Sequence, residues 1–147
     1  MIPKFRGLSI DENNKGKWQY GYLIEDTGQS FIINEVIEAN EQYITIGSWY
    51  PVRPDTVSQS TGLHDKNGKE IFEGDILKVA NNDSSWFEVV KYDHDKAMFI
   101  SKEVNLKYEV PETPLYDLFS PYLFKVEVIG NIWEDGDLID GKKANEN

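Results

Sequence analysis

The first quarter of the chain alternates apolar and polar residues in short runs, which is typical of half-buried strands. Residues 4–10 alternate in this way and predict a first strand. Residues 18–24 predict a second strand, with apolar side chains at every second position: Trp18, Tyr20, Tyr22 and Ile24. A turn at residues 26–29 precedes the apolar run at residues 31–33, so we expect the third strand to pair back on the second. Short loops of this kind predict an antiparallel meander.

The pattern weakens after the third strand. Residues 36–42 are acidic and weakly patterned, which predicts a loop or a frayed helical turn. Strands follow at residues 43–46 and 49–52, with a bulge at Gly47 and Ser48 between them. Prolines 51 and 54 cannot donate to a strand ladder, so we expect a connector there and a domain boundary between residues 56 and 57.

Turn signals are densest between residues 57 and 79. Asn67 and Gly68 both tolerate a positive φ, so they predict a hairpin with a type I′ turn. Glu73-Gly74-Asp75 predicts a second tight turn, in which the Asp75 carboxylate accepts a hydrogen bond from a nearby backbone N–H.

Further short strands are expected at residues 76–79, 87–92, 98–101 and 126–133. This succession favours an SH3-like small barrel for residues 57–139. Pro114 and Pro121 bound a segment with apolar residues at helical spacing, which predicts one short helix or 3₁₀ turn. The polar residues 140–147 predict a flexible tail. The expected fold is therefore mainly β: an N-terminal antiparallel meander over residues 1–56, then the SH3-like barrel.

Three segments resemble the YopX family, small proteins encoded mainly by phages and prophages of Gram-positive bacteria. Residues 61–77, T-G-L-H-D-K-N-G-K-E-I-F-E-G-D-I-L, are similar to its central signature. K-F-R at residues 4–6 with K-W-Q-Y-G at 17–21 resembles its opening, and V-I-G-N-I-W-E at 128–134 its close. The family commonly has an aromatic residue before T-G-L, where this chain has Ser60.

The resemblance implies a mostly β protein of phage origin with no settled biochemical activity. It also singles out a set of residues in the central signature, which we interpret as turn-forming and structural rather than as a binding site: Thr61, Gly62, Asp65, Asn67, Gly68, Glu73, Gly74 and Asp75.

Composition narrows the function classes. With 39% hydrophobic and 13% aromatic residues, the 147-residue chain has enough apolar side chains for a core. It has no apolar run of about 20 residues, as a membrane span requires, and no signal-peptide pattern, so we expect a protein of the bacterial host cytoplasm. The absence of cysteine excludes disulfides, thiolate metal sites and a cysteine nucleophile.

The net charge of −11 argues against a protein whose main function is to bind the phosphate groups of a nucleic acid. Residues 1–56 carry 5 basic and 8 acidic groups, a net of −3, and residues 57–147 carry 10 basic and 18 acidic groups, a net of −8. Solubility is the simplest interpretation of this charge.

We expect no metal and no cofactor. His94 lies between Asp93 and Asp95, but neighbouring side chains point apart, and a metal site needs further converging ligands. Residues 65–70 begin like a calcium loop, yet Lys69 occupies a position where an oxygen ligand is required.

Catalytic groups are also scarce. Glu70, Glu73 and Asp75 are the one candidate set for a carboxylate-based hydrolase, against the simpler interpretation that they shape a turn. The sequence has no serine–histidine–acid motif context and no Gly-rich phosphate loop. We therefore expect a protein that is not an enzyme.

Aromatic side chains are numerous for a small β protein, and exposed ones typically anchor protein interfaces. The candidate binding residues are Trp18, Tyr20, Trp49, Tyr50 and Trp86. We expect a protein partner, either a second copy of the chain or a host or phage factor. The alternatives are nucleic-acid binding through the N-terminal hairpin, whose lysines and arginine are Lys4, Arg6, Lys15 and Lys17, or an acidic mimic of DNA.

Overall fold

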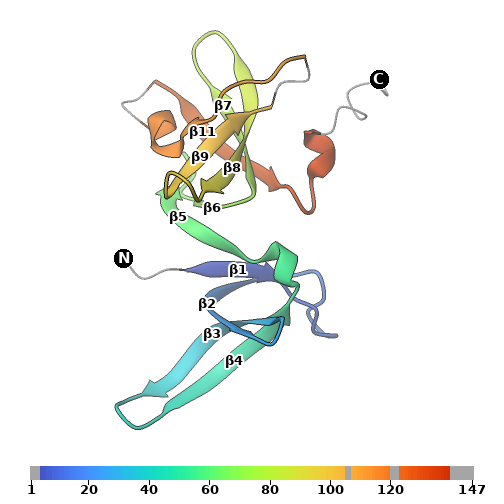
Figure 1. Cartoon of the computed structure of the whole chain (residues 1–147), viewed down its shortest axis with the longest axis vertical. Helices are drawn as coiled ribbons and strands as arrows, with labels where there is room; N and C mark the ends of the chain where they lie inside the picture. Colours follow the sequence, from blue (N-terminus) through green and yellow to red (C-terminus); the bar gives the residue numbers. More distant parts are fainter. Residues whose placement is uncertain (1–3, 105–106, 120–122, 140–147) are drawn as a thin grey trace. The chain divides into compact units, whose positions relative to one another are not determined.

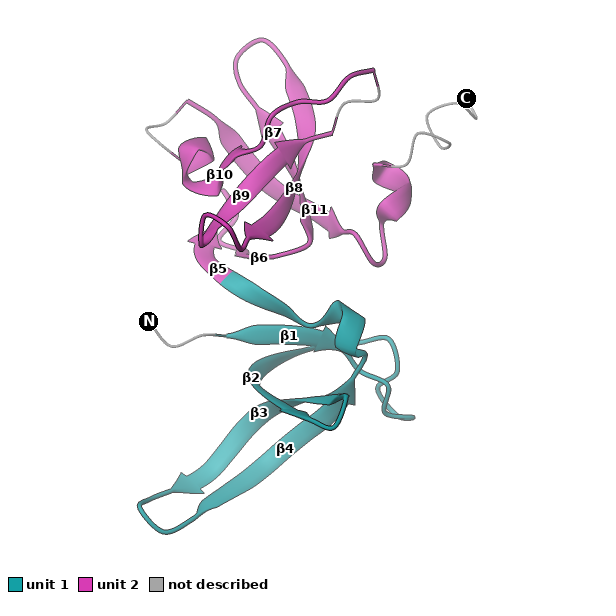
Figure 2. Ribbon diagram, viewed as in Figure 1, with its two compact units in different colours: residues 1–60 teal, residues 61–147 magenta. Residues whose placement is uncertain are grey.

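The computed structural model describes residues 4–104, 107–119 and 123–139. These residues form mainly β-strands in two antiparallel sheets, with short 3₁₀ helices between them (Figure 1). Contacts divide the chain into two compact units, residues 1–60 and residues 61–147 (Figure 2). The domain boundary expected from the sequence, between residues 56 and 57, precedes this division. The expected tail, residues 140–147, lies outside the described residues. No helix in the described ranges is long and apolar enough to cross a membrane.

Unit 1 is the antiparallel meander that the alternating pattern predicted. Its strands are β1 (Phe5–Leu8), β2 (Trp18–Asp26), β3 (Gln29–Ala39) and β4 (Ile44–Val52). They lie in the order β4-β3-β2-β1, and the first residues of β5 (Ser58–His64) pair with β1. Thr27 and Gly28 both have positive φ, 49° and 79°, and form the two-residue turn of the β2–β3 hairpin.

The loop or helical turn predicted for residues 36–42 is wrong for residues 36–39, which are strand, and only residues 40–42 lie in a loop. Strand β3 continues through most of this segment because Val36 pairs with Ile46 of β4, and this cross-strand contact overrides the weak local pattern. The turn is short, since Asn40 Oδ1 accepts the backbone N–H of Gln42 at 2.8 Å. Figure 1 shows the far end of the β3–β4 hairpin extending past β2 as a two-stranded ribbon.

The sheet of unit 1 curls so that the ends of β1 and β4 meet. Ser9 bridges Val52, and the backbone N–H of Arg53 donates to Leu8 O at 2.9 Å. The connector that follows is the 3₁₀ helix η1 (Pro54–Thr56). The buried Thr56 hydroxyl accepts from Leu8 N at 2.9 Å and donates to Arg53 O at 2.7 Å. Unit 1 has a small apolar core: Leu8, Ile32, Ile33 and Val52.

Unit 2 contains β6 (Glu70–Phe72) and a five-stranded sheet in the order β10-β9-β8-β7-β11. The strands of this sheet are β7 (Asp75–Ala80), β8 (Ser85–Asp93), β9 (Met98–Glu103), β10 (Thr113–Pro114) and β11 (Lys125–Asn131). Strands β10 and β11 are its two ends, so the described strands form no closed barrel. The SH3-like barrel is therefore not confirmed. The predicted 3₁₀ turn is present as η2 (Leu115–Phe119), and a further 3₁₀ helix, η3 (Gly136–Leu138), follows β11.

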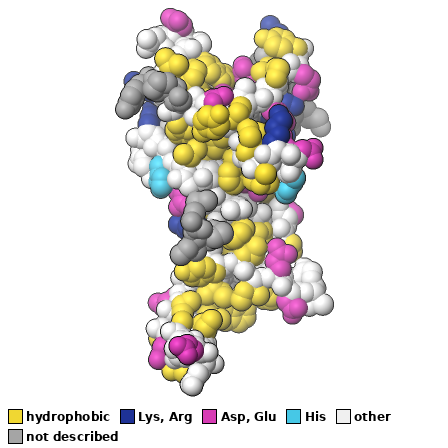
Figure 3. Space-filling model, turned by 60° about the vertical axis from the view of Figure 1, so that its left-hand side comes forward, with side chains coloured by type: hydrophobic (Ala, Val, Ile, Leu, Met, Phe, Trp, Pro, Cys, Tyr) yellow, Lys and Arg dark blue, Asp and Glu magenta, His cyan; other side chains and the backbone are white. Residues whose placement is uncertain are grey.

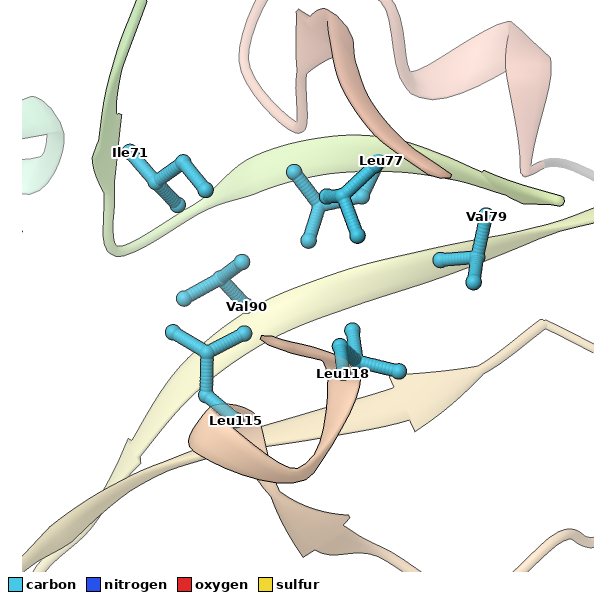
Figure 4. Close-up of a cluster of buried hydrophobic side chains, with 7 residues drawn as sticks. Ile71, Leu77, Val79, Val90, Leu115 and Leu118 are labelled. Atoms are coloured by element: carbon cyan, nitrogen blue, oxygen red, sulfur yellow. The ribbon is translucent and has the colours of Figure 1, made fainter. Parts of the chain in front are cut away.

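The core of unit 2 lies between this sheet and η2. Figure 4 shows Leu115 and Leu118 of η2 pointing toward Val90 of β8 and Leu77 of β7. The buried cluster is Ile71, Leu77, Val79, Val90, Leu115, Leu118 and Val126. The apolar residues between the prolines of this segment thus close one side of the core.

The turn between β6 and β7 packs tightly against the end of the β11 segment. Gly74 has φ +88°, and a Cβ atom there would overlap the indole ring of Trp133. Its backbone N–H donates to Val90 O at 2.8 Å, and its carbonyl accepts from Ile132 N at 2.9 Å. This position therefore requires glycine for two separate reasons, the left-handed backbone and the ring against it.

Substituting Gly74 with alanine should destabilise the protein more than the same change at Gly68. Gly68 has φ +82° but nothing within contact distance of a built Cβ, so its cost is the left-handed conformation, about 1–2 kcal/mol. Gly74→Ala adds an overpacking cost of about 1–3 kcal/mol against Trp133. Urea unfolding of both variants measures the difference, and equal losses would contradict the packing role of Gly74.

Candidate functional site

The Asp65 carboxylate organises the central signature segment. This buried side chain accepts three backbone N–H groups: its Oδ1 from Asn67 at 2.8 Å and Lys69 at 2.9 Å, and its Oδ2 from Val128 of β11 at 2.9 Å. The backbone N–H of Lys66 also donates to Val126 O at 2.9 Å. The turn is thereby fastened to a strand more than sixty residues away.

The type I′ turn predicted at Asn67-Gly68 is wrong. Gly68 has a positive φ, but Asn67 does not. The reason is the Asp65 side chain, which binds the backbone of the turn itself and leaves one left-handed position instead of two.

The same contacts set the acidity of Asp65. Burial alone would raise its pKa, but the backbone N–H groups of Val128, Lys69 and Asn67 and the charge of Lys69 outweigh burial. The pKa of Asp65 therefore lies below its ordinary value of 3.8. The carboxylate is charged in the folded protein at neutral pH.

The second acidic turn is held in a similar way. The Asp75 carboxylate, 1% exposed, accepts the backbone N–H of Phe72 at 2.8 Å, as the turn interpretation predicted. Thr61 Oγ1 donates to Ile71 O at 2.8 Å and accepts from Leu63 N at 3.1 Å. These contacts support a structural role for the signature residues, and they leave the hydrolase hypothesis without further support from Asp75.

The closing V-I-G-N-I-W-E segment completes the same framework. Asn131 Oδ1 accepts the backbone N–H groups of Trp133 and Glu134 at 3.0 and 2.9 Å. Asn131 N donates in turn to Asp135 Oδ2 at 3.0 Å. Together with the ring of Trp133 on Gly74, these bonds hold the central and closing segments against each other in unit 2. The side-chain oxygens of Asp65, Asp75 and Asn131 thus accept backbone N–H groups of these two segments.

The geometry of the described residues does not support the two metal hypotheses drawn from the sequence. Among the described residues, no three His, Asp or Glu side chains converge as a metal ion would need. The ring of His94 contacts Tyr92, with centroids 4.9 Å apart.

The aromatic candidates separate into three places. Trp18, Tyr20 and Trp49 are on one face of the unit 1 sheet, because β2 pairs with β3 at Tyr22–Ile33 and β3 with β4 at Ile33–Trp49. Tyr50 pairs with Ile32 and faces the other way. Trp86 belongs to unit 2, where its indole N–H donates to the buried Glu88 carboxylate at 2.7 Å and its ring meets Phe124 edge-on.

We call the first group the aromatic face. It comprises Trp18, Tyr20, Tyr22 and Ile24 of β2, Phe31 of β3 and Trp49 of β4. Tyr20 is 41% exposed, Tyr22 53% and Trp49 54%. Figure 3 shows hydrophobic side chains gathered over the strands of unit 1. Tyr22 and Ile24 were visible in the alternating pattern but were not among the candidate binding residues, because only the register shows that they share a face with Trp49.

Two cations lie on this face but are already engaged. The Arg6 guanidinium is 4.5 Å from the Trp18 ring centroid, and its Nε donates to Ser58 Oγ at 3.0 Å. Lys4 Nζ lies 5.7 Å from the ring centroid of Tyr20. Arg6 is only 4% exposed, so the basic patch expected at the first hairpin has one member buried in the fold.

Replacing Asp65 with asparagine should cost about 1.5–3 kcal/mol of unfolding free energy at neutral pH, because charge-assisted bonds to backbone N–H groups are lost. Because the pKa of Asp65 is lower in the folded state than in the unfolded state, the ionised carboxylate stabilises the fold at pH values above the unfolded-state pKa, near 3.8. This stabilisation is lost as the pH falls through the folded-state pKa. The difference in unfolding free energy between wild type and Asp65→Asn should therefore become smaller below about pH 3.8.

Urea unfolding at a series of pH values measures this difference in unfolding free energy. Asp83→Asn, at an exposed turn in the same unit, is the control for losing one negative charge. A gap that stays constant through the acid range would contradict the role given to the Asp65 carboxylate.

Comparisons with known proteins agree with this framework. No curated protein matches the chain. The crystal structure of protein EF1440 from Enterococcus faecalis is 28% identical, with a TM-score of 0.58, over 95% of this chain and 99% of that one. The model of the YopX protein family matches residues 4–140. The three segments and the mainly β fold thus have one explanation: the chain belongs to the YopX family.

Proposed function

We propose that this protein is a phage or prophage accessory protein that acts by binding a protein partner through the aromatic face of unit 1, without catalysing a reaction. The observation that carries this proposal is the exposure of Tyr22 and Trp49 side by side with Ile33 on one sheet face. Aromatic side chains supply large contact area with little entropy loss, and they are enriched at the energetic centres of protein interfaces.

The ribbon beyond β2 extends this surface. It carries further exposed apolar side chains: Val36, Ile37, Tyr43, Ile44 and Ile46. An isolated two-stranded ribbon is marginally stable in water, so a partner that covers these side chains would also stabilise it. Apolar exposure on this scale within one small unit is typical of an interaction surface.

Nucleic-acid binding is less well supported. Base stacking needs free ring faces beside a basic groove. Here a guanidinium already covers the Trp18 ring, and no basic residue occurs from residue 27 to residue 52. The acidic composition leaves mimicry of DNA as a variant of protein binding, in which the partner would have a basic groove.

Serine substitutions at Trp49 and Tyr22 should weaken partner binding about tenfold or more, because truncating a central interface aromatic costs about 2 kcal/mol or more. Partners captured from a lysate of a Gram-positive host are purified and titrated against wild type and variants. Tyr116→Ser, 63% exposed in unit 2, is the control and should bind like wild type. Repeated failure to capture any partner, together with a strictly monomeric mass, would overturn the proposal.

A further inference from the structure

Unit 2 contains a cavity of about 230 Å³, lined by residues of β8, β9 and η2 and of the segments before β10 and β11. Trp86, Leu118 and Phe124 belong to its apolar wall. The two aromatic rings pack against the buried cluster that contains Leu118, and they meet edge-on with centroids 5.8 Å apart. The packing of the core therefore holds this wall of the cavity in place.

Three carboxyl groups line the same cavity, those of Glu88, Glu103 and Asp117. Alternate residues of a strand share a face, so Glu88 lies on the same face of β8 as Val90 of the buried cluster. Glu103 is directly opposite Glu88 in the β8–β9 register, so both glutamates are on the core side of the sheet. Like charges directly opposite each other destabilise a sheet, and a cation between them would relieve this cost.

The Glu88 side chain is buried, 5% exposed, and both of its printed partners are neutral. One carboxylate oxygen accepts Trp86 Nε1–H at 2.7 Å, and the other accepts the Ser101 hydroxyl at 2.5 Å. A carboxylate has about four acceptor positions, so each oxygen can accept a further donor. Among the described residues that line the cavity there is no lysine, arginine or histidine. Lys102 alternates to the other face of β9, where its Nζ lies 2.7 Å from the Glu109 carboxylate.

This lining favours one class of ligand. Its carboxylates repel phosphate and other anions. A metal ion is not favoured, because within the described ranges no three carboxylates converge as a metal ion would need. An organic cation fits both parts of the lining, since its charge pairs with the carboxylates while its alkyl chain packs on the apolar wall. The Trp86 ring, whose N–H is bonded to Glu88, adds cation–π attraction.

We propose that this cavity of unit 2 binds the charged end of an alkylammonium or alkylguanidinium group. The carboxylates of Glu88 and Glu103 pair with the cation, and the rings of Trp86 and Phe124 contact its alkyl chain. Such a group is carried by the lysine or arginine side chain of a polypeptide and by free amines. The cavity is separate from the aromatic face of unit 1, so this inference goes beyond the proposed function.

Titration of the full-length chain with n-butylammonium chloride tests the site. The reporter is the Trp86 indole N–H signal in two-dimensional NMR, assigned by its absence in Trp86→Phe. This N–H group is bonded to Glu88, so its chemical shift should change and reach saturation as the cation binds. Neutral n-butanol, which has the same alkyl chain, should leave the signal unchanged. The absence of a saturable change, or an equal response to n-butanol, would overturn the proposal.

Two glutamine variants each remove one charge from the cavity. Glu88→Gln should raise the dissociation constant of n-butylammonium about tenfold or more, because a charge-assisted hydrogen bond is lost. Its amide can keep the internal bonds, with the oxygen accepting from Trp86 and the NH₂ group donating to Ser101 Oγ. Glu103→Gln, at a half-buried position, should raise the constant about threefold or more. Unchanged constants in both variants would overturn the proposal.

Glu127→Gln is the matched control. It is the same substitution in the same sheet, but Glu127 follows the buried Val126 and therefore lies on the other face of β11, 3.4 Å from Lys66 Nζ. This variant should bind n-butylammonium like wild type. Equal losses in Glu127→Gln and Glu88→Gln would mean attraction to the net charge alone and would overturn the site. Thermal melts followed by circular dichroism confirm that the variants fold, and Glu103→Gln provides the test if Glu88→Gln does not.

Blocked peptides with a single lysine or arginine identify the source of the cation. Binding as tight as that of n-butylammonium, or tighter, indicates a polypeptide side chain, and weaker binding indicates a free amine. Trp49→Ser changes only unit 1 and should bind n-butylammonium like wild type. A cavity that binds no cation in a protein that still captures its partner overturns this inference alone. Cation binding without any captured partner overturns the proposed function alone.

Discussion

The buried carboxylate of Asp65 is the interaction on which unit 2 depends most. Three backbone N–H groups converge on it. Two come from its own turn and one comes from β11, which is distant in the sequence. A charged group inside a protein is costly unless it is fully hydrogen-bonded, and backbone donors meet this need without another charge. The same carboxylate shapes the β5–β6 turn and fixes its place on the last strand.

This constraint explains why the central and closing signature segments of the family occur together in the chain. Asp65 reaches Val128, while Gly74 receives both the N–H of Ile132 and the ring of Trp133. A change in one segment therefore disturbs the other. The residues that resemble the family most strongly are engaged in holding the fold, and the surface that we propose for binding a protein partner lies in unit 1, where Tyr20, Tyr22 and Trp49 are exposed.

The two units differ in how many of their apolar side chains are buried. Unit 2 has a seven-residue apolar cluster and a framework of buried hydrogen bonds. Unit 1 has a small core and many apolar side chains in solvent, on the aromatic face and along the β3–β4 ribbon. A sheet with so much uncovered apolar surface gains stability when a partner covers it, which links its marginal core to the binding that we propose.

The sequence by itself determined the β class, the meander, the turn at Gly74 and the role of Asp75, because alternation and turn residues act locally. It did not determine the turn at Asn67, the length of β3 or the grouping of the aromatic residues. The turn at Asn67 is set by the Asp65 side chain, which binds the backbone N–H groups of Asn67 and Lys69. The other two depend on strand pairing, and Ile46 draws Val36 into a strand. Trp49 joins Tyr22 only through strand register. Tertiary structure decided these features because pairing and side-chain hydrogen bonds outweigh local preference wherever the two differ.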